Sequence, residues 1–228
     1  MQTLKVLLIA GVASLGLGSV ALADDAPAIT YNIGAASDYV FRGISQTDGA
    51  GQVFGGADVS MGKAYAGTWL SNVDFNNGTT MEYDFYAGYK PQVGPVALDV
   101  GVIYYGYANK PSGADEAYWE AKVAGSVPVG KGTIGAAVYY SPEFPFKTGE
   151  ASYYELNASA PLTEKASVSA AVGHQSVVGP ADYNTWNLGV GYALTSKLGV
   201  DLRYWDTSEH GFGKIYGSRV ALSLKATF

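Results

Sequence analysis

Charged side chains recur at alternate positions in segments whose other positions are apolar, and this spacing is the first sign of chemistry in the 228-residue chain. An extended strand turns successive side chains to opposite faces, so the charges of one segment share a face. If the strands close into a barrel with this face inward, opposite charges attract more strongly there than on an open surface. By parity the set holds eight acids and six bases, namely Asp38, Asp58, Glu82, Asp84, Asp99, Glu120, Glu155 and Asp201, and Arg42, Lys90, Lys122, Arg203, Arg219 and Lys225.

Arg42 follows Asp38 by four residues on one predicted strand face, roughly 13 Å along an extended chain at ~3.3 Å per residue. The two side chains therefore cannot pair directly, and each is expected to find partners on other strands. One interpretation is a constriction built around Arg42, and the other is a salt-bridge network that holds the shape of the barrel. Both stay open. Because acids and bases nearly balance and the wall has three arginines, we expect a narrow, weakly cation-preferring pore for small polar solutes rather than a strongly anion-selective one.

Two histidines, His174 and His210, are the candidates for acid–base catalysis in a competing enzyme hypothesis. His174 lies close to Ser176, and His210 lies near Asp206 and Glu209, so a catalytic triad at the barrel rim is conceivable. No spacing signature accompanies either histidine, and ordinary loop histidines are the favoured interpretation. The chain has no cysteine, and it has no phosphate-loop, metal or cofactor motif. We therefore expect no catalytic residues, no metal and no cofactor.

The elements that position these charges are about twelve segments with period-2 alternation, each near the ~9–11 residues of a membrane-crossing strand. Val220, Leu222, Leu224, Ala226 and Phe228, for example, share one face of the last segment. The third segment, from Ala64 to Ser71, alternates poorly, and its outward face is not predicted. The segments begin close to Ile29, Gln52, Ala64, Thr79, Pro95, Ala117, Thr133, Ser152, Ala166, Tyr183, Leu198 and Ser218.

Short and long connections alternate along the chain, as they do in outer-membrane barrels with short periplasmic turns and long external loops. The short turns carry lysines such as Lys63 and Lys131, whereas the long loops are richer in acids. The long loop Pro142-Glu143-Phe144-Pro145-Phe146 is apolar and stiff, and either an inward constriction or an outward contact surface fits it. Aromatic residues near strand ends predict interfacial girdles, at Tyr39, Phe41, Tyr89, Tyr104, Tyr140, Tyr154, Tyr192 and Tyr204.

The N-terminal segment has the layout of a cleaved signal peptide, which is the evidence for export. Lys5 precedes the apolar run Val6 to Val20, and Ala21-Leu22-Ala23 precedes Asp24. We expect cleavage between Ala23 and Asp24, so that residues 1–23 are the signal peptide and residues 24–228 the barrel. Without Lys5 the chain has 13 bases against 20 acids, a net charge of −7, which argues against nucleic acid as a partner. A soluble β-sandwich or a lipocalin-like barrel is the competing architecture.

Four stretches resemble the TorF-type porins of the bacterial outer membrane, also called the Gcw family. The most specific runs from Ala36 to Thr47 and reads ASDYVFRGISQT, and the others are AGTWLSNVDF, YDFYAGY and GVIYY. The resemblance spans essentially the whole mature chain and implies a small outer-membrane barrel with a poorly defined transport role. Phe228, with apolar residues at alternate positions before it, is similar to the signal that barrel-assembly machinery reads.

These observations together predict an all-β chain, an antiparallel transmembrane up-and-down β-barrel of about 12 strands with both termini on the periplasmic side. The expected partners are outer-membrane lipid and lipopolysaccharide, the barrel-assembly machinery and small polar solutes. Loop acids that hold divalent cations between lipopolysaccharide molecules are a further option, although scattered acids are usually a solvated surface.

Overall fold

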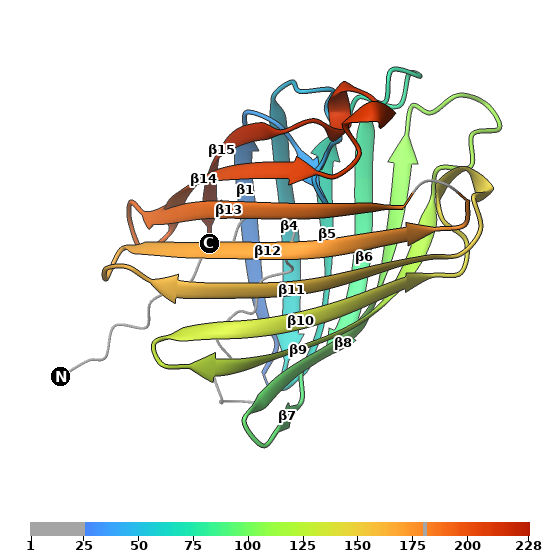
Figure 1. Ribbon diagram of the computed structural model, residues 1–228. Coiled ribbons are helices and arrows are strands. Elements are labelled where there is room, and N and C mark those ends of the chain that lie inside the picture. The colour runs from blue at the N-terminus through green and yellow to red at the C-terminus, as the bar shows by residue number, and fades with distance from the viewer. Residues whose placement is uncertain (1–25, 180–181) are drawn as a thin grey trace.

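The computed structural model describes residues 26–179 and 182–228, which form one closed antiparallel barrel of twelve long strands (Figure 1). The predicted signal peptide and its cleavage site, Ala23–Asp24, lie outside the described residues. The barrel strands are β1 (Ala28–Ala36), β4 (Gln52–Met61), β5 (Ala64–Asn72), β6 (Met81–Tyr89), β8 (Val96–Ala108), β9 (Tyr118–Val129), β10 (Gly132–Ser141), β11 (Ala151–Pro161), β12 (Ala166–Val177), β13 (Tyr183–Ala193), β14 (Leu198–Thr207) and β15 (Arg219–Thr227).

Each strand pairs with its neighbours in chain order, and the ring closes because β1 pairs with both β4 and β15. Phe228 extends this closing ladder, since its backbone and that of Tyr31 exchange two hydrogen bonds of 2.9 and 3.1 Å. The predicted fold class is confirmed, and every strand begins within two residues of its expected position. Period-2 alternation predicted the strands well because lipid and interior act on opposite faces of each strand.

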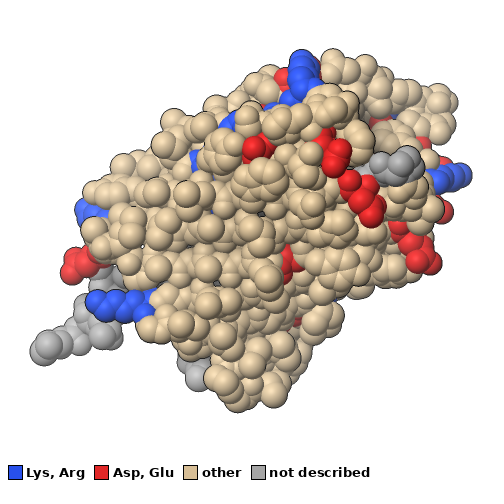
Figure 2. Space-filling model, in the orientation of Figure 1, with Lys and Arg blue, Asp and Glu red and all other residues tan. Residues whose placement is uncertain are grey.

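The outer face of the barrel is apolar. Val220, Leu222, Leu224 and Phe228 are exposed there, as the alternation predicted. On β5, where the outward face was open, Leu70 is exposed while Tyr65 and Trp69 pack inside the barrel. Figure 2 shows an uncharged surface along the strands, with lysines and acids gathered toward the two ends.

The two ends of the barrel differ in their connections. At the short-turn end, β4 and β5 are joined by Gly62-Lys63, and the other turns are similarly brief, one of them holding the two-residue strand β7 (Gln92–Val93). At the long-loop end lie three short 3₁₀ helices, η1 (Pro145–Lys147), η2 (His210–Phe212) and η3 (Lys214–Tyr216). Within residues 26–179 and 182–228, no helix is long and apolar enough to cross a membrane.

The segment after β1 departs from the prediction. The first wall strand was expected to carry Asp38 and Arg42, but β1 ends at Ala36, and the chain then folds into the barrel interior. There β2 (Val40–Phe41) and β3 (Ile44–Ser45) form a separate two-stranded sheet, which we call the inner hairpin. The wall strand stops because nine residues already span the barrel wall, as ~9–11 are enough to cross a bilayer.

Candidate functional site

The inner hairpin is a tight turn that reaches across the barrel interior. Val40 pairs with Ser45 and Phe41 with Ile44, and Arg42 and Gly43 form the turn with φ values of 48° and 83°. Positive φ at both turn residues is the geometry of the two-residue hairpins that suit twisted strands. A side chain on Gly43 would collide with Thr185 of β13 and Thr207 of β14, so glycine also permits the close approach of the tip to that wall.

The Arg42 guanidinium fixes the tip of the inner hairpin. Its Nη1 and Nη2 atoms donate to the two carboxylate oxygens of Glu120 on β9, both at 2.7 Å, and Nη1 also donates to Gln175 Oε1 on β12 at 3.2 Å. The guanidinium carbon lies 4.8 Å from the Tyr139 ring centroid and 4.4 Å from that of Tyr153. Bidentate pairing combined with contacts to aromatic rings is an arrangement that arginine, unlike lysine, can satisfy.

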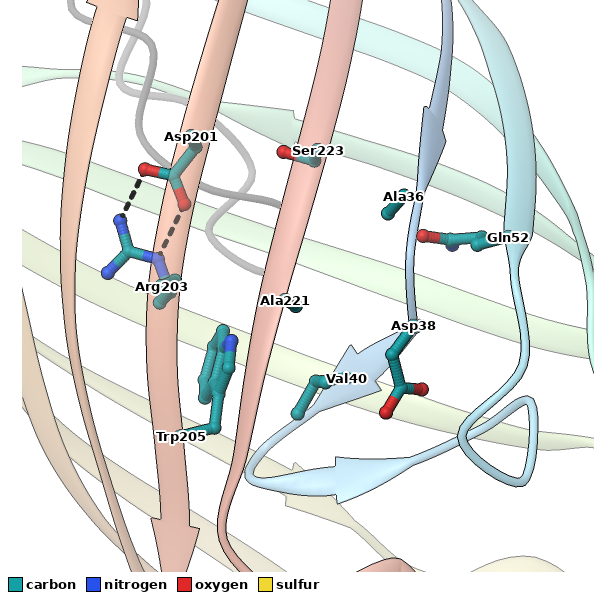
Figure 3. Close-up of a pocket in the computed structure, with 9 residues that line it drawn as sticks. All are labelled: Ala36, Asp38, Val40, Gln52, Asp201, Arg203, Trp205, Ala221 and Ser223. Atoms are coloured by element: carbon teal, nitrogen blue, oxygen red, sulfur yellow. Dashed lines mark hydrogen bonds and ion pairs between the residues drawn. The ribbon is translucent and has the colours of Figure 1, made fainter.

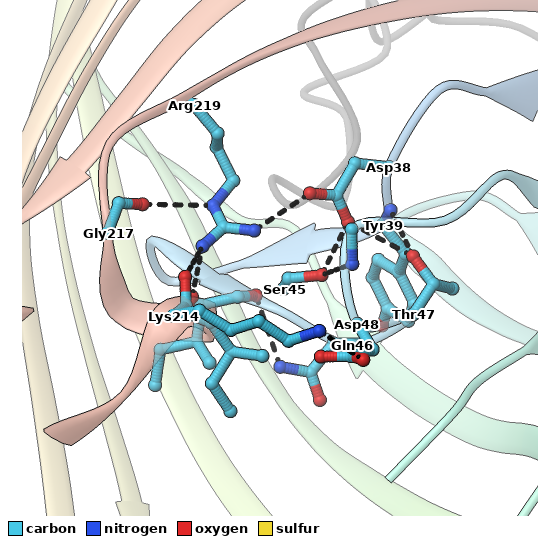
Figure 4. Close-up of polar contacts among 12 residues, drawn as sticks. Asp38, Tyr39, Ser45, Gln46, Thr47, Asp48, Lys214, Gly217 and Arg219 are labelled. Carbon is cyan, nitrogen blue, oxygen red and sulfur yellow. Dashed lines mark hydrogen bonds and ion pairs between the residues drawn. The ribbon is translucent and has the colours of Figure 1, made fainter. Parts of the chain in front are cut away.

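The base of the inner hairpin is bonded to the first residue of β15 and to the long loop before it (Figure 4). Arg219 donates to Asp38 at 2.9 Å, and Asp38 also accepts hydrogen bonds from Ser45 and Thr47. Farther out, Lys214 Nζ lies 2.6 Å from Asp48 Oδ2, and this hydrogen bond holds the pKa of Asp48 below its usual value. Asp38 and Arg42 thus pair with other elements and not with each other.

One side of the inner hairpin packs on aromatic residues of β5, β8 and β9. Tyr39 meets the edge of Trp69 with ring centroids 5.3 Å apart, and Phe41 meets Tyr105 at 5.9 Å. Tyr105 in turn stacks on Tyr118 at 4.4 Å. The predicted girdle positions of Tyr39 and Phe41 are therefore wrong, because both rings follow the chain into the interior. The other predicted girdle residues lie on the outer face, where Tyr89, Tyr140, Tyr154, Tyr192 and Tyr204 are exposed and Tyr104 packs on Trp119.

The Pro142–Phe146 loop has one phenylalanine that points inward and one that is exposed at the rim. Phe144 turns inward and packs against Tyr118, with ring centroids 5.1 Å apart. Phe146, two residues later, is exposed at the rim, where Lys147 pairs with Asp115 at 2.7 Å. The loop thus seals the aromatic side of the interior and also presents an apolar ring outside.

The opposite side of the inner hairpin faces a small cavity against β14, β15, β1 and β4 (Figure 3). Its main polar group is Arg203, which donates through Nε and Nη2 to Asp201 at 3.1 and 3.0 Å. Arg203 also reaches Asn187 at 2.6 Å and Ser169 at 2.7 Å, so it lies flat along the wall. The cavity is lined by Ala36, Asp38, Val40, Gln52, Asp201, Arg203, Trp205, Ala221 and Ser223.

The remaining charges of the predicted set also lie inside the barrel. Lys122 pairs with Asp99 at 2.7 Å, and Asp99 accepts a further hydrogen bond from Tyr65. Tyrosine hydroxyls donate to three more carboxylates, from Tyr86 to Asp58, Tyr39 to Glu82 and Tyr153 to Glu155. Lys225 is half-buried on the inner face of β15, and Lys90 lies over the Tyr65 ring. Their role as a pore lining stays a prediction.

Three neutral or aromatic residues of the site were not predicted. Gln175 accepts from Arg42, Gln52 lines the cavity with its amide bonded to Ser71, and Trp205 gives the cavity its aromatic wall. Alternation along its strand predicts that each of these side chains points inward. Because the side chains are uncharged, the sequence gave no reason to select them as site residues. Glu116 was also missed as a buried group, because it lies outside the strands, where Thr79 and Asn77 donate to it.

Neither histidine forms the expected triad with residues that the structure describes. His174 Nδ1 is bonded to Asn184 at 3.0 Å, and both its Nε2 and Ser176 Oγ face Asp182, at 4.0 and 3.4 Å. Ser176 Oγ is thus hydrogen-bonded to the Asp182 carboxylate, whereas in a triad it would be hydrogen-bonded to the histidine. His210 is bonded to Asp206 at 2.6 Å with its ring more than half exposed. In the described part of the chain, no group of three or more His, Cys, Asp or Glu side chains is placed to hold a metal.

Solved structures similar to this chain include porins and an outer-membrane channel. The KdgM porin aligns with a TM-score of 0.60 at 10% identity, over 89% of this chain and 99% of its own. The NanC porin aligns with a TM-score of 0.58 at 11% identity, over 88% and 99%. The COG4313 outer membrane channel from Pseudomonas putida F1 aligns with a TM-score of 0.55 at 10% identity, over 91% and 96%. The chain therefore has the fold of an outer-membrane porin barrel.

The family follows from sequence. The chain belongs to the family described as "Bacterial protein of unknown function (Gcw_chp)", whose model matches residues 21–228. This confirms the resemblance to the Gcw family over the whole barrel. No curated protein matches the sequence.

Proposed function

We propose that the protein is a narrow outer-membrane channel through which small polar solutes diffuse passively. The observation that carries the proposal is the inner hairpin, which fills the aromatic side of a porin-fold barrel but leaves a small cavity, lined in part by polar side chains, on its other side. The proposed solute path runs beside the hairpin, past hydrogen-bonding side chains. The path is narrow, which limits it to small molecules.

The proposed weak cation preference follows from which charged side chains inside the barrel are paired with an opposite charge. Each of the three arginines has a carboxylate within 3.0 Å, at Glu120, Asp201 and Asp38, so none presents an unpaired positive charge. Several carboxylates, such as Asp58 and Glu155, have tyrosine partners instead of cations. The KdgM porin has been solved with disordered oligogalacturonate, a polyanion. With its arginines neutralised, this barrel is poorly suited to such a solute.

The proposed orientation places the long-loop end outside the cell and both termini in the periplasm, with the apolar outer face in lipid and the rim next to lipopolysaccharide. Residues 24–228 form the mature barrel in this proposal. Phe228 ends the closing ladder with its ring exposed, a position that suits recognition by the barrel-assembly machinery. We propose no enzymatic role, because in the described residues the histidine hydrogen bonds go to Asn184 and Asp206 and not to a nucleophilic hydroxyl.

A closed structural barrel is the second candidate, and the burial of the interior at the hairpin level favours it. Gln52, Glu82, Glu120, Gln175 and Thr207 are all at most 2% exposed. Planar-bilayer recordings of the refolded protein distinguish the two. Ion currents with a reversal potential on the cation side are expected for the channel. Silence in every salt would refute it, and anion preference would refute only the selectivity.

A further inference from the structure

Asp84, on the inner face of β6, is a buried carboxylate without a full set of partners. The residue is 7% exposed, and its Oδ1 atom is buried with no hydrogen-bond partner. The neighbouring carboxylates differ, because Glu82 accepts from Tyr39 and Glu120 accepts from Arg42 and Tyr105. A buried carboxylate that lacks a partner carries a large desolvation cost, so either a proton or a cation is expected to accompany it.

Two aromatic rings flank this carboxylate, and two more pack on those rings. Trp69 on β5 and Tyr105 on β8 are the direct cross-strand neighbours of Asp84 on the same face, and such neighbours have Cβ atoms about 4.5–5.5 Å apart. From the inner hairpin, Tyr39 packs on Trp69 and Phe41 packs on Tyr105. Asp84 therefore lies beside a cluster of four rings that the hairpin completes, and we call Asp84 with these rings the aromatic box.

The charge in this layer is negative. Glu82 lies two residues from Asp84 on the same face, about 7 Å along the strand, and Glu120 is the other carboxylate acting on Asp84. The Arg42 guanidinium brings one positive charge, which pairs with Glu120. Two carboxylates thus remain with tyrosine or no partner, so the layer can accept a proton or a further cation.

Arg42 shows what a cation bound in this layer looks like, with one carboxylate and aromatic faces around it. Asp84 offers the same two kinds of contact. It does not offer the six or more oxygen ligands that Mg²⁺ or Ca²⁺ requires, whereas ring faces attract ammonium and guanidinium ions. We propose that Asp84, with the rings of Trp69, Tyr105, Tyr39 and Phe41, is a binding site for a small organic cation. The site rests on the proposed channel function and names its solute class.

Calorimetric titration of the full barrel, refolded in detergent, tests the site with methylammonium and methylguanidinium chloride. One saturable site is expected, with quenching of tryptophan fluorescence because Trp69 lines the box. Asp84→Asn keeps the shape of the side chain and removes its charge, so binding should weaken by about tenfold to a hundredfold. The matched control is Asp115→Asn, a loop carboxylate paired with Lys147, which should bind as the wild type does.

Two results would overturn the site. One is wild-type titration without saturation, or equal binding by Asp84→Asn. The other is an infrared band of a protonated carboxylic acid at neutral pH that is lost in Asp84→Asn, because a proton would then occupy the place of the cation. The titration requires no transport, so bilayer silence with intact binding would refute only the channel. Conductance without binding would refute only the site.

Discussion

The two sides of the inner hairpin meet the barrel wall in different ways. On one side, Tyr39 and Phe41 interlock with Trp69 and Tyr105, and Arg42 is held in a cage of Glu120 and two tyrosine rings. On the other side, Val40 and Asp38 border a cavity whose far wall carries the Asp201–Arg203 pair. Both walls hold the hairpin, since Val40 packs on Trp205 and Ala221 and Asp38 pairs with Arg219 on the second side. Only the second side, which we call the polar side, keeps a small cavity, so the proposed solute path is placed there.

The largest expected effect is that of Arg42→Ala on the aromatic side. The change leaves Glu120 buried without its cation, and breaking a buried pair in this way costs about 3–5 kcal/mol. We expect a lower urea midpoint for the barrel in detergent and, because the hairpin tip is released, several-fold larger currents in planar bilayers. Unchanged currents together with unchanged unfolding would show that the aromatic contacts alone hold the hairpin.

Arg42→Lys is the matched control for this prediction. Lysine keeps the positive charge but cannot make the bidentate bond or pack a planar guanidinium against the Tyr139 and Tyr153 rings. An intermediate loss of stability is therefore expected. A loss equal to that of Arg42→Ala would mean that the shape of the guanidinium, and not its charge, is what matters.

A pair of glycine substitutions sharpens the comparison between the two sides. A Cβ at Gly67 would lie 2.5–2.6 Å from the Tyr86 ring and hydroxyl, and that ring is packed in the aromatic core with its hydroxyl on Asp58. A Cβ at Gly189 would lie 2.6 Å from the Arg203 guanidinium carbon, which borders the cavity. Overpacking a filled core costs about 1–3 kcal/mol.

Gly67→Ala should therefore destabilise the barrel by that amount in urea unfolding, with little change in conductance. Gly189→Ala should unfold nearly as the wild type does, because Arg203 has a flexible side chain that can move into the cavity. Its currents should be smaller, since the displaced guanidinium narrows the path. The reverse pattern, with the larger unfolding shift at Gly189, would contradict the assignment of the packed and open sides.

The wall of the barrel was predictable and the inner hairpin was not, for a physical reason. Lipid on one face and interior on the other impose alternation on each strand separately. A strand such as Arg219 to Phe228 can therefore be predicted from its own residues alone. The hairpin depends on contacts distant in the chain, between Arg42 and Glu120 and between Asp38 and Arg219. A local signal did exist, because Tyr39-Val40-Phe41 continues past the ~9–11 residues that a strand needs and breaks the alternation.

The charges of the site were found by parity, but their pairing was not. Alternation placed Asp99, Lys122, Asp201 and Arg203 inside the barrel but did not show which charges on neighbouring strands lie close enough to pair. Strand register determines the pairing. It places Lys122 opposite Gly101, two residues from Asp99 on β8. The unpartnered Asp84 is likewise a result of register, because the β5 and β8 positions beside it are occupied by Trp69 and Tyr105.

A smaller effect on the currents is expected on the polar side from Arg203→Ala. The change leaves Asp201 as an unpaired negative charge beside the cavity, and it enlarges the path. A unit charge about 8 Å from a passing ion in water contributes about 0.5 kcal/mol, or about twofold in a permeability ratio. Reversal potentials in a salt gradient should therefore shift toward cations by about that ratio, with somewhat larger currents. Arg203→Lys, which keeps the charge, should shift the potential less, and a shift toward anions would place the path elsewhere.

The smallest effect belongs to the outer tie of the hairpin, Asp48 with Lys214. Because this hydrogen bond lowers the pKa of Asp48, its contribution is complete above the unfolded pKa near 3.9 and is lost as pH falls through the lower folded value. The stability difference between wild type and Asp48→Asn should thus be constant at neutral pH and vanish in stronger acid.

Asp115 has the same chemistry, since its pKa is lowered by Lys147, but it does not touch the hairpin. Asp115→Asn should therefore show the same acid dependence of unfolding while leaving the currents at neutral pH unchanged, whereas Asp48→Asn should make them noisier by loosening the hairpin base. Equal currents in both variants would mean that the Asp38–Arg219 pair is sufficient to hold the base in place.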